Sequence, residues 1–292
     1  MKSLSQFSIL EILQLSPLWL FLKQLRNDAW LSWYKRKEAF GEKEFLIQNQ
    51  HLANKNILIV IAFEQPKVLE WLFEFANKNL VDFQLMIFDN SRTDPLRAAV
   101  KNVCLQYGVP YLGLPLNTSR HPNRSHGMAM TWVFERIIKK IKPSWFGYLD
   151  HDMVPVAPIS SAFIHSQQPF YGMLNSGHDC WNLWAGYCFF NYEKVKNLPL
   201  NFLYDFSMGL DTGGRNWHCM YKNHANQNVQ FAPNVYQDVK VDQTQATIQL
   251  VDGQWLHIGG VSYNNNLASK EAFYEQLIGK LHTGQALQDF YI

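Results

Sequence analysis

The sequence lacks most features that mark secreted, nucleic-acid-binding or membrane-spanning proteins. Its four cysteines form no CxxC pair and lie among apolar or aromatic neighbours, which is typical of buried free thiols in a reducing compartment. The formal net charge is only +2 with both signs interspersed, so no broad positive field favours nucleic acid. No basic-then-apolar signal peptide opens the chain, and the longest uncharged apolar-rich run near its start, residues 12–22, is too short to span a bilayer. We therefore expect a cytoplasmic protein.

The composition is that of a globular enzyme. Among 292 residues, 47% are hydrophobic and 15% aromatic, which is enough for a substantial core and argues against long disorder. We expect an N-terminal helical arm at residues 1–54, a nucleotide-binding half at 55–158, and an acceptor-binding half at 159–292 that ends in a helix. The two halves form one continuous catalytic domain from residue 55.

The N-terminal arm carries apolar residues at helical spacing, and Pro17 is expected to start its second helix. Trp30, Trp33 and Tyr34 precede a run of cations at residues 35–37. One interpretation is a peripheral membrane contact, with the aromatic rings at the headgroups and the cations on anionic lipid at the inner face of a membrane. The other is an arm that packs on its own domain or on a twin subunit.

From residue 56 the pattern alternates between buried strands and helices. Continuous apolar runs of strand length occur at residues 57–63, 83–88, 111–116 and 145–150, with helices predicted between them at 66–79, 94–107 and 125–142. Asp94 is expected as an N-cap. This alternation predicts an α/β fold with a mostly parallel central sheet flanked by helices.

The second half is expected to be mixed. Strand-like runs occur at residues 169–174 and 184–190, a helix is predicted at 215–222, and Asp252-Gly253 marks a hairpin turn. A final helix is expected from residue 270.

Two carboxylates stand two residues apart in the stretch YLDHDMVP, at the end of the strand predicted at 145–150. In open parallel sheets, ligands bind outside the carboxyl ends of the strands, and Asp89 and Asp150 both fall at such ends. Asp150 with Asp152 suits a hard divalent cation, Mg²⁺ or Mn²⁺, which prefers oxygen ligands and shares them with phosphates. A DxD in a surface loop is commonly only solvated, but the apolar strand before this one favours a functional pair.

The motif FDNSRTD at residues 88–94 precedes LDHDMVP at residues 149–155. Together they resemble the strand-two ending and the metal-binding DxD of glycosyltransferase family 2 and related enzymes with the GT-A fold. The resemblance covers about residues 56–158, and it departs where AFEQ stands at the end of strand one and where Ser91 replaces a glycine. It implies a GT-A type, Rossmann-like fold and a metal-dependent, hexosyltransferase-like glycosyltransferase. Such an enzyme moves a sugar from a nucleoside-diphosphate-sugar to a hydroxyl of a glycan or lipid-linked acceptor, and we expect inversion.

The resemblance also implies residue roles. Asp89 would hold the base or ribose of the nucleotide, although an Asx-turn is its structural alternative. Asp150 would lie near the ribose and diphosphate, and Asp152 would ligate the metal. The remaining candidates for nucleotide-sugar binding are Ala62, Phe63, Asn90 and His151, together with Arg124 and His126, which lie in a basic cluster before a helix N-terminus or in a polar surface loop.

An inverting mechanism needs a general base for the acceptor hydroxyl. Asp211, in MGLDTGG, is the first candidate and Asp179 the second; a helix N-cap is the alternative role for Asp211. His257 resembles a late histidine that serves as a further metal ligand in several GT-A enzymes, or is a strand-end histidine bonded to backbone. Trp181 and Trp184 either stack on an acceptor sugar or pack in the core.

Two other functions stay open. A nucleotidyltransferase that makes a nucleotide-sugar would use a similar metal site, but AFEQPK after the first strand has no glycine for a phosphate loop. The other alternative is a non-catalytic module that has the same fold and binds a nucleotide or a glycan. The discriminating feature is whether Asp150, Asp152 and His257 converge, with Asp211 across an open cleft.

Overall fold

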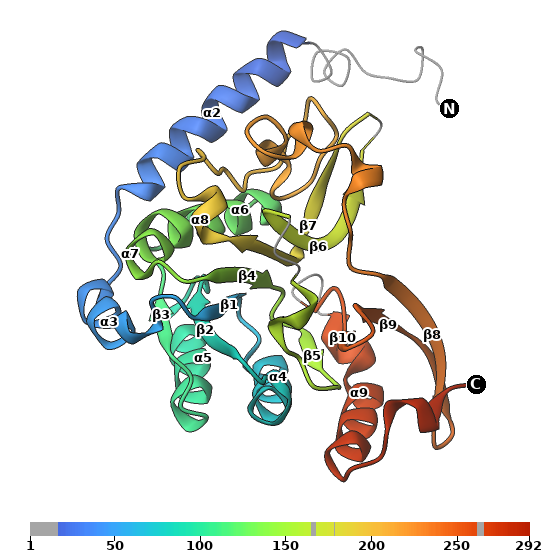
Figure 1. Ribbon diagram of the computed structural model, residues 1–292. Helices are drawn as coiled ribbons and strands as arrows, with labels where there is room; N and C mark the ends of the chain where they lie inside the picture. Colours follow the sequence, from blue (N-terminus) through green and yellow to red (C-terminus); the bar gives the residue numbers. More distant parts are fainter. Residues whose placement is uncertain (1–16, 165–167, 178, 262–265) are drawn as a thin grey trace.

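The computed structural model describes residues 17–164, 168–177, 179–261 and 266–292 (Figure 1). The helix expected before Pro17 lies outside these residues, whereas the second helix of the arm begins at Pro17 as predicted. Within the described part of the chain, no helix combines the length and apolar character needed to cross a bilayer.

A six-stranded sheet in the order β3-β2-β1-β4-β7-β6 forms the centre of the molecule. The first four strands in the chain run parallel, and β7 and β6 continue the sheet antiparallel. This confirms the predicted α/β class with a mostly parallel sheet. The strands are β1 (Asn56–Ala62), β2 (Phe83–Asp89), β3 (Tyr111–Gly113), β4 (Trp145–Leu149), β6 (Phe170–Ser176) and β7 (Trp181–Asn191).

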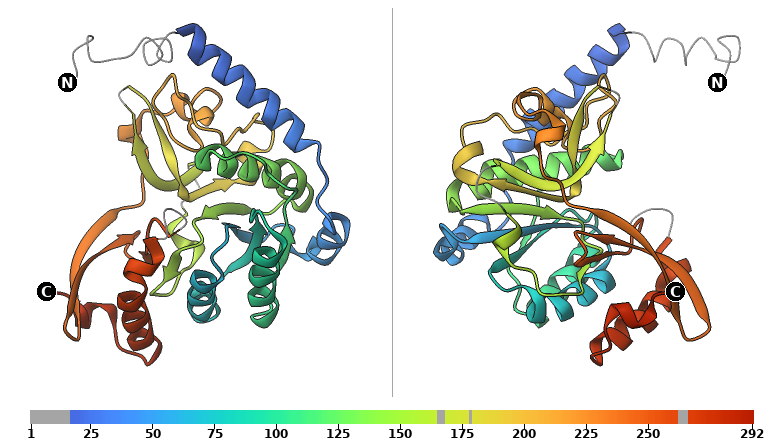
Figure 2. Two further views of the ribbon diagram at one scale, coloured as in Figure 1. Left: turned by 180° about the vertical axis from the view of Figure 1, so that it is seen from behind. Right: turned by 45° about the vertical axis from the view of Figure 1, so that its right-hand side comes forward.

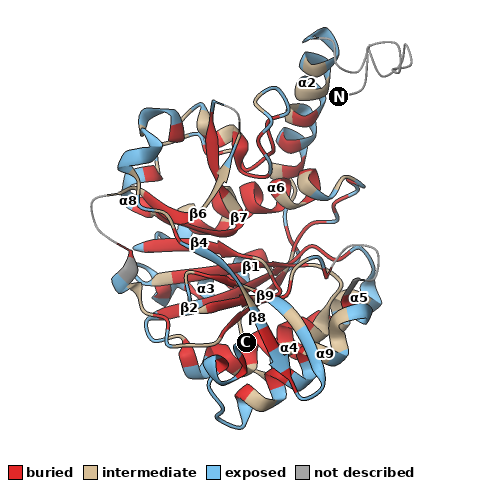
Figure 3. Cartoon of the chain, turned by 90° about the vertical axis from the view of Figure 1, so that its right-hand side faces the viewer, coloured by how far each residue is buried: buried red, intermediate tan, exposed pale blue. Residues whose placement is uncertain are grey.

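Helices cover both faces of this sheet, and the central strands are buried between them (Figure 3). Successive residues of β1 point to opposite faces, so Leu58 and Val60 pack on one side, and Ile57, Ile59 and Ile61 pack on the other. The first side is covered by α4 (Pro66–Asn79) and α5 (Asp94–Gln106). The second is covered by α6 (Pro122–Val133), a π-helical turn (Phe134–Ile138) and α7 (Lys139–Ile141).

A second, antiparallel sheet has the order β5-β10-β9-β8 and packs against α9 (Asn266–His282) (Figure 1). Its β9–β10 hairpin turns at Asp252 and Gly253, whose φ angles of 55° and 66° confirm the predicted Asp-Gly turn. Its short strand β5 directly follows Asp152, so this sheet begins beside the carboxylate pair. The strands are β5 (Met153–Pro155), β8 (Asn234–Val241), β9 (Thr244–Val251) and β10 (Trp255–His257).

Two local predictions are wrong. The helix expected at 215–222 is two short 3-10 turns, because the buried Asn216 side chain accepts a hydrogen bond from the Asn201 N–H at 2.8 Å and ties this segment to a neighbouring loop. The N-cap of α5 is Thr93, and Asp94 lies in the first turn. The other elements are α2 (Pro17–Lys35), α3 (Glu42–Gln48), α8 (Tyr192–Val195) and 3-10 turns at Gln50–Leu52, Ser161–Phe163, Asn226–Asn228 and Leu287–Phe290.

Candidate active site

A pocket of about 400 Å³ opens at the carboxyl ends of β1, β2 and β4. It lies where β1 and β4 adjoin. The helix that follows β1, α4, and the helix that precedes β4, α6, cover opposite faces of the sheet, and such a switch point is the usual place for a ligand in an open α/β sheet. The predicted nucleotide-sugar residues that line it are Phe63, Asn90, His126, Asp150 and His151.

Asp150, Asp152 and His257 converge at the edge of this pocket. One ligand atom from each lies within 4.8 Å of the others, so together they could hold a metal ion. Asp150 follows β4 and Asp152 precedes β5. Because β10 pairs antiparallel with β5, His257 comes opposite Met153 and so beside Asp152, although the two are far apart in the chain.

A hydrogen bond to Gln249 orients the His257 ring as a metal ligand. Its Nδ1 lies 2.6 Å from the Gln249 Oε1 on the paired strand β9, and its Nε2 lies 3.6 Å from the Asp152 Oδ1. An amide oxygen only accepts, so Nδ1 carries the proton and Nε2 presents its lone pair to the carboxylates. The ring centroid of Trp184 lies 4.9 Å from that of His257, which limits the rotation of the imidazole.

Replacing Gln249 with alanine is expected to lower the Mn²⁺ affinity of the protein by about 10- to 100-fold, because the partner that orients the ligating imidazole is lost. Calorimetric titration with Mn²⁺ measures the change. Gln245→Ala is the matched control. Gln245 is exposed on the same strand, and it pairs with Lys240 of β8, whereas Gln249 pairs with His257 of β10. Equal losses in the two variants would contradict a specific orienting role for Gln249.

Asp150 is the electrostatically strained member of the cluster. Burial and, next, the neighbouring charge of Asp152 raise its pKa to about 6, against the opposing effect of His257 and His151. Gly186 permits this crowding, because a Cβ at that position would lie 2.6 Å from the Asp150 Oδ2. A bound cation would relieve the repulsion between the two carboxylates.

The raised pKa of Asp150 predicts a pH dependence for metal binding. Protons compete with the cation below about pH 6, so Mn²⁺ affinity is expected to rise about fivefold between pH 5 and 6 and to level off above pH 7. In the metal-free protein, the folded pKa exceeds the ordinary value of 3.8, so this carboxyl destabilises the fold increasingly as the pH rises from about 4 to 6. Calorimetric titrations at pH 5, 6, 7 and 8 test this, and an affinity that is constant from pH 5 to 6 would contradict it.

Asp211 approaches the site from the second half of the chain. Its carboxylate accepts hydrogen bonds from its neighbour's N–H, on Thr212, at 2.7 Å and from the Asn123 side chain, which places it near the start of α6. It is exposed and does not belong to the residues that line the described pocket, yet its charge acts on Asp150 and on His126. Burial lowers the pKa of His126 to about 4, which keeps this ring neutral at physiological pH.

The side chains of the neighbouring residues Asp89 and Asn90 lie in different environments. The Asp89 carboxylate is buried and accepts hydrogen bonds from the Tyr111 hydroxyl at 2.9 Å and from the Ser91 N–H at 2.8 Å, which is the Asx-turn alternative. Its burial raises its pKa. Asn90, by contrast, lines the pocket, and its N–H donates to the Ala62 carbonyl at 2.9 Å. Ala62 therefore positions Asn90 through its backbone.

Four other predicted residues lie in different environments, from the buried core to the exposed surface. The buried Arg124 guanidinium donates to Asn27 of α2 at 3.1 Å, so it joins two helices and is turned away from the pocket. Trp181 is 4% exposed and packs among core aromatic rings, which leaves no face for an acceptor sugar. Trp184 is half-buried beside His257, next to the candidate metal ligands. Asp179 is exposed in the β6–β7 connection, outside the lining of the described pocket.

Sequence reasoning missed other residues that line the pocket. Arg92 brings a cation to it in addition to Arg120, which belongs to the basic cluster expected before α6, and the Arg92 guanidinium lies 5.2 Å from the centre of the Phe63 ring. Asn90 carries a buried Oδ1 that has no hydrogen-bond partner among the described residues. Arg92 could have been found from its place in FDNSRTD, beside Asn90. Gln249 had no local signal, because only strand pairing brings it to His257.

No protein-family model matches the chain, and no curated protein matches it. Among solved structures, it is similar to TarS of S. aureus (14% identity, TM-score 0.36), with 51% of this chain and 30% of TarS covered. It is also similar to the bifunctional glycosyltransferase WbbM (10%, 0.34; 49% and 32% covered). A third is the mannosyltransferase PcManGT of Pyrobaculum calidifontis, solved with GDP-Man and Mn²⁺ (11%, 0.34; 62% and 55% covered). The chain therefore spans about half or less of the length of these structures.

Proposed function

We propose that this protein is a metal-dependent glycosyltransferase that moves a sugar from a nucleoside-diphosphate-sugar to a hydroxyl of a glycan or lipid-linked acceptor. The observation that carries the proposal is the convergence of Asp150, Asp152 and His257 at the edge of a pocket at the carboxyl ends of parallel strands. The resemblance of residues 88–94 and 149–155 to the motifs of glycosyltransferase family 2 also supports it.

The ligand set fits Mn²⁺ better than Mg²⁺. Two carboxylates suit either ion, but Mg²⁺ is usually held by carboxylates, water and phosphates, and an imidazole whose second nitrogen is already bonded suits a transition metal. A bound Mn²⁺ would stabilise the negative charge that develops on the departing diphosphate.

The remaining lining residues suit the other parts of a nucleotide-sugar. The Arg92 and Arg120 side chains line the pocket and would neutralise phosphate oxygens. The buried Oδ1 of Asn90 is available to accept a hydrogen bond from a nucleotide base, next to the flat ring of Phe63. Asp211 would take the proton of the acceptor hydroxyl on the opposite side, which is the arrangement an inverting reaction requires.

Location and domain organisation complete the proposal. All four cysteines are free thiols, which supports a reducing compartment such as the cytoplasm. We assign residues 55–158 to the donor and residues 159–292 to the acceptor, with residues 1–54 as an arm.

The test is thermal unfolding of the full chain against a panel of nucleoside diphosphates and nucleotide-sugars, with and without Mn²⁺, repeated on Asp152→Ala. A ligand at a hundred times its dissociation constant adds about 2.7 kcal/mol to the free energy of unfolding, which is a readily measured shift. We expect one base to stabilise the protein only with metal, and Asp152→Ala to abolish the effect. If no nucleotide shifts the melt with any metal, the proposal fails and a module without turnover is favoured.

A further inference from the structure

Helix α2 carries apolar side chains on two sides. Leu31 and Tyr34 are buried in the core, so Tyr34 is not available to a membrane surface, whereas a second apolar side is turned outward. Leu18, Leu22 and Leu25 follow one another at helical spacing and are between 46% and 68% exposed, and Phe21 and Trp33 extend the same surface. We call these five residues the outer face of α2. A surface helix normally buries its apolar stripe, so this orientation needs a cause.

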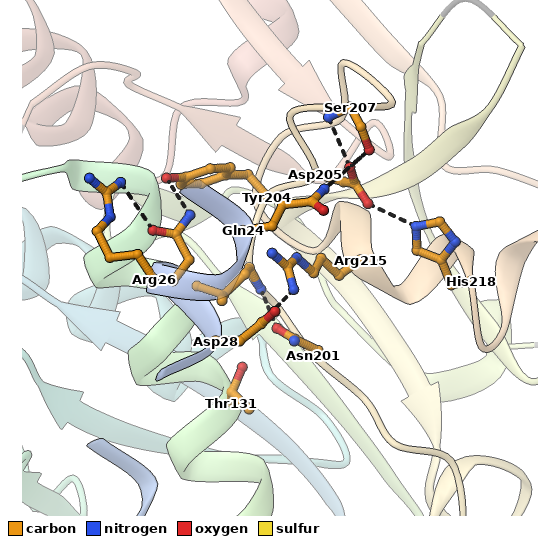
Figure 4. Close-up of polar contacts among 12 residues, drawn as sticks. Gln24, Arg26, Asp28, Thr131, Asn201, Tyr204, Asp205, Ser207, Arg215 and His218 are labelled. Carbon is orange, nitrogen blue, oxygen red and sulfur yellow. Dashed lines mark hydrogen bonds and ion pairs between the residues drawn. The ribbon is translucent and has the colours of Figure 1, made fainter. Parts of the chain in front are cut away.

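The inward side of α2 is fixed by polar contacts to the acceptor half (Figure 4). The Gln24 side chain donates to the Asp205 carboxylate at 3.3 Å, and the buried Asn27 amide donates to the Tyr204 hydroxyl at 3.0 Å. Arg215 forms an ion pair with Asp28 of the helix. These contacts hold the helix in register on the segment from Tyr204 to Arg215, so the outer face is presented by a helix that is anchored on its other side.

Charges around the outer face are mainly positive. Arg26 and Arg36 are exposed along and directly after the helix, and Lys35 is half-exposed. Lys23, over the Phe206 ring, and Lys37, which donates to the Leu116 carbonyl, add positive charge beside the helix while contacting the protein. The nearby acids are already paired: Asp28 with Arg215, and Glu38 with Arg136. The surface therefore combines exposed leucine and aromatic side chains with a surplus of cations. A second copy of the chain would bring like charges together across such a face, whereas an anionic lipid surface is complementary to it.

We propose that α2 docks parallel to the surface of an anionic bilayer, with its outer face at the boundary between headgroups and acyl chains and its cations on the headgroups. The segment that anchors α2 also carries Asp211, so docking would hold the acceptor side of the site next to the membrane. The second, antiparallel sheet and α9 lie at the other end of the molecule from α2 (Figure 2). This orientation suits an acceptor that is itself a lipid.

The experiment is flotation of the full chain with phosphatidylcholine vesicles, with and without phosphatidylserine. We expect binding that needs phosphatidylserine and weakens with salt, because it depends on the exposed cations. The triple variant Leu18→Ser, Leu22→Ser, Leu25→Ser should bind at least about tenfold more weakly, because it loses three leucine side chains that would insert into the bilayer. The matched control is the double variant Val81→Ser, Leu105→Ser, whose side chains are similarly exposed on other elements.

Equal binding by the triple variant and the wild type would overturn the proposal, as would the absence of binding to any vesicle. The proposal would also be overturned if the wild type and the control variant sedimented as dimers and the triple variant as a monomer. The partner of the outer face would then be a second copy of the chain. The outer face lies apart from the pocket, so the melting shifts produced by nucleotides should be the same in the triple variant. Failure at the membrane is thereby distinguished from failure of the proposed donor site.

Discussion

The Asp152→Asn variant is expected to transfer sugar with a kcat/KM lowered by about 10²- to 10³-fold. Asparagine keeps the size of the buried side chain but removes one of the two charges that would hold the cation beside His257. Charge on the departing diphosphate would then develop without full neutralisation. The folded structure should persist, because the change also removes the repulsion between Asp152 and Asp150.

Release of nucleoside diphosphate from the nucleotide-sugar chosen by the melting panel measures this loss, across a range of Mn²⁺ concentrations. Raising Mn²⁺ should recover part of the activity, since the variant is impaired in metal binding. Asp238→Asn, on the exposed strand β8, provides a control for the loss of one negative charge and should match the wild type. Unaltered turnover in Asp152→Asn at limiting Mn²⁺ would rule out the proposed metal site.

Asp211→Asn is expected to lower kcat by about 10²- to 10⁴-fold while leaving the affinity for the donor unchanged. The amide retains an oxygen that can accept from the Thr212 N–H, so the local turn is preserved and only the proton acceptor is lost. Because the donor pocket is lined by other residues, nucleotide binding should be insensitive to the change. The loss should therefore appear in turnover with acceptor present and not in the melting shift.

The competing candidate supplies the control. Asp179→Asn should keep activity within about twofold of the wild type, as is usual for an exposed side chain away from a site. If Asp179→Asn lost activity and Asp211→Asn turned over normally, Asp179 in the β6–β7 connection would be the general base. Normal turnover in both variants would argue against an inverting mechanism that uses either carboxylate, and would make a retaining one the next hypothesis.

The parts of this protein that could be predicted from sequence are those set by local patterns. Continuous apolar runs identified β1, β2 and β4 because strands buried on both faces need no polar residues. Asp252-Gly253 identified a hairpin because both residues accept positive φ. Asp150 and Asp152 were located because a DxD after an apolar strand must lie at the carboxyl edge of the sheet, where parallel strands bring their ends together.

Tertiary structure alone decided how distant side chains meet and which way they point. Antiparallel pairing of β10 with β5 and β9 placed His257 between Asp152 and Gln249, a register that no local pattern encodes. Packing turned Asp89 toward Tyr111, although it adjoins a residue that lines the pocket. The helical period of α2 was evident in the sequence, but its buried side was not. Packing of Leu31 and Tyr34 in the core, together with hydrogen bonds from Gln24 and Asn27 to a segment far along the chain, decided which side of the helix is buried.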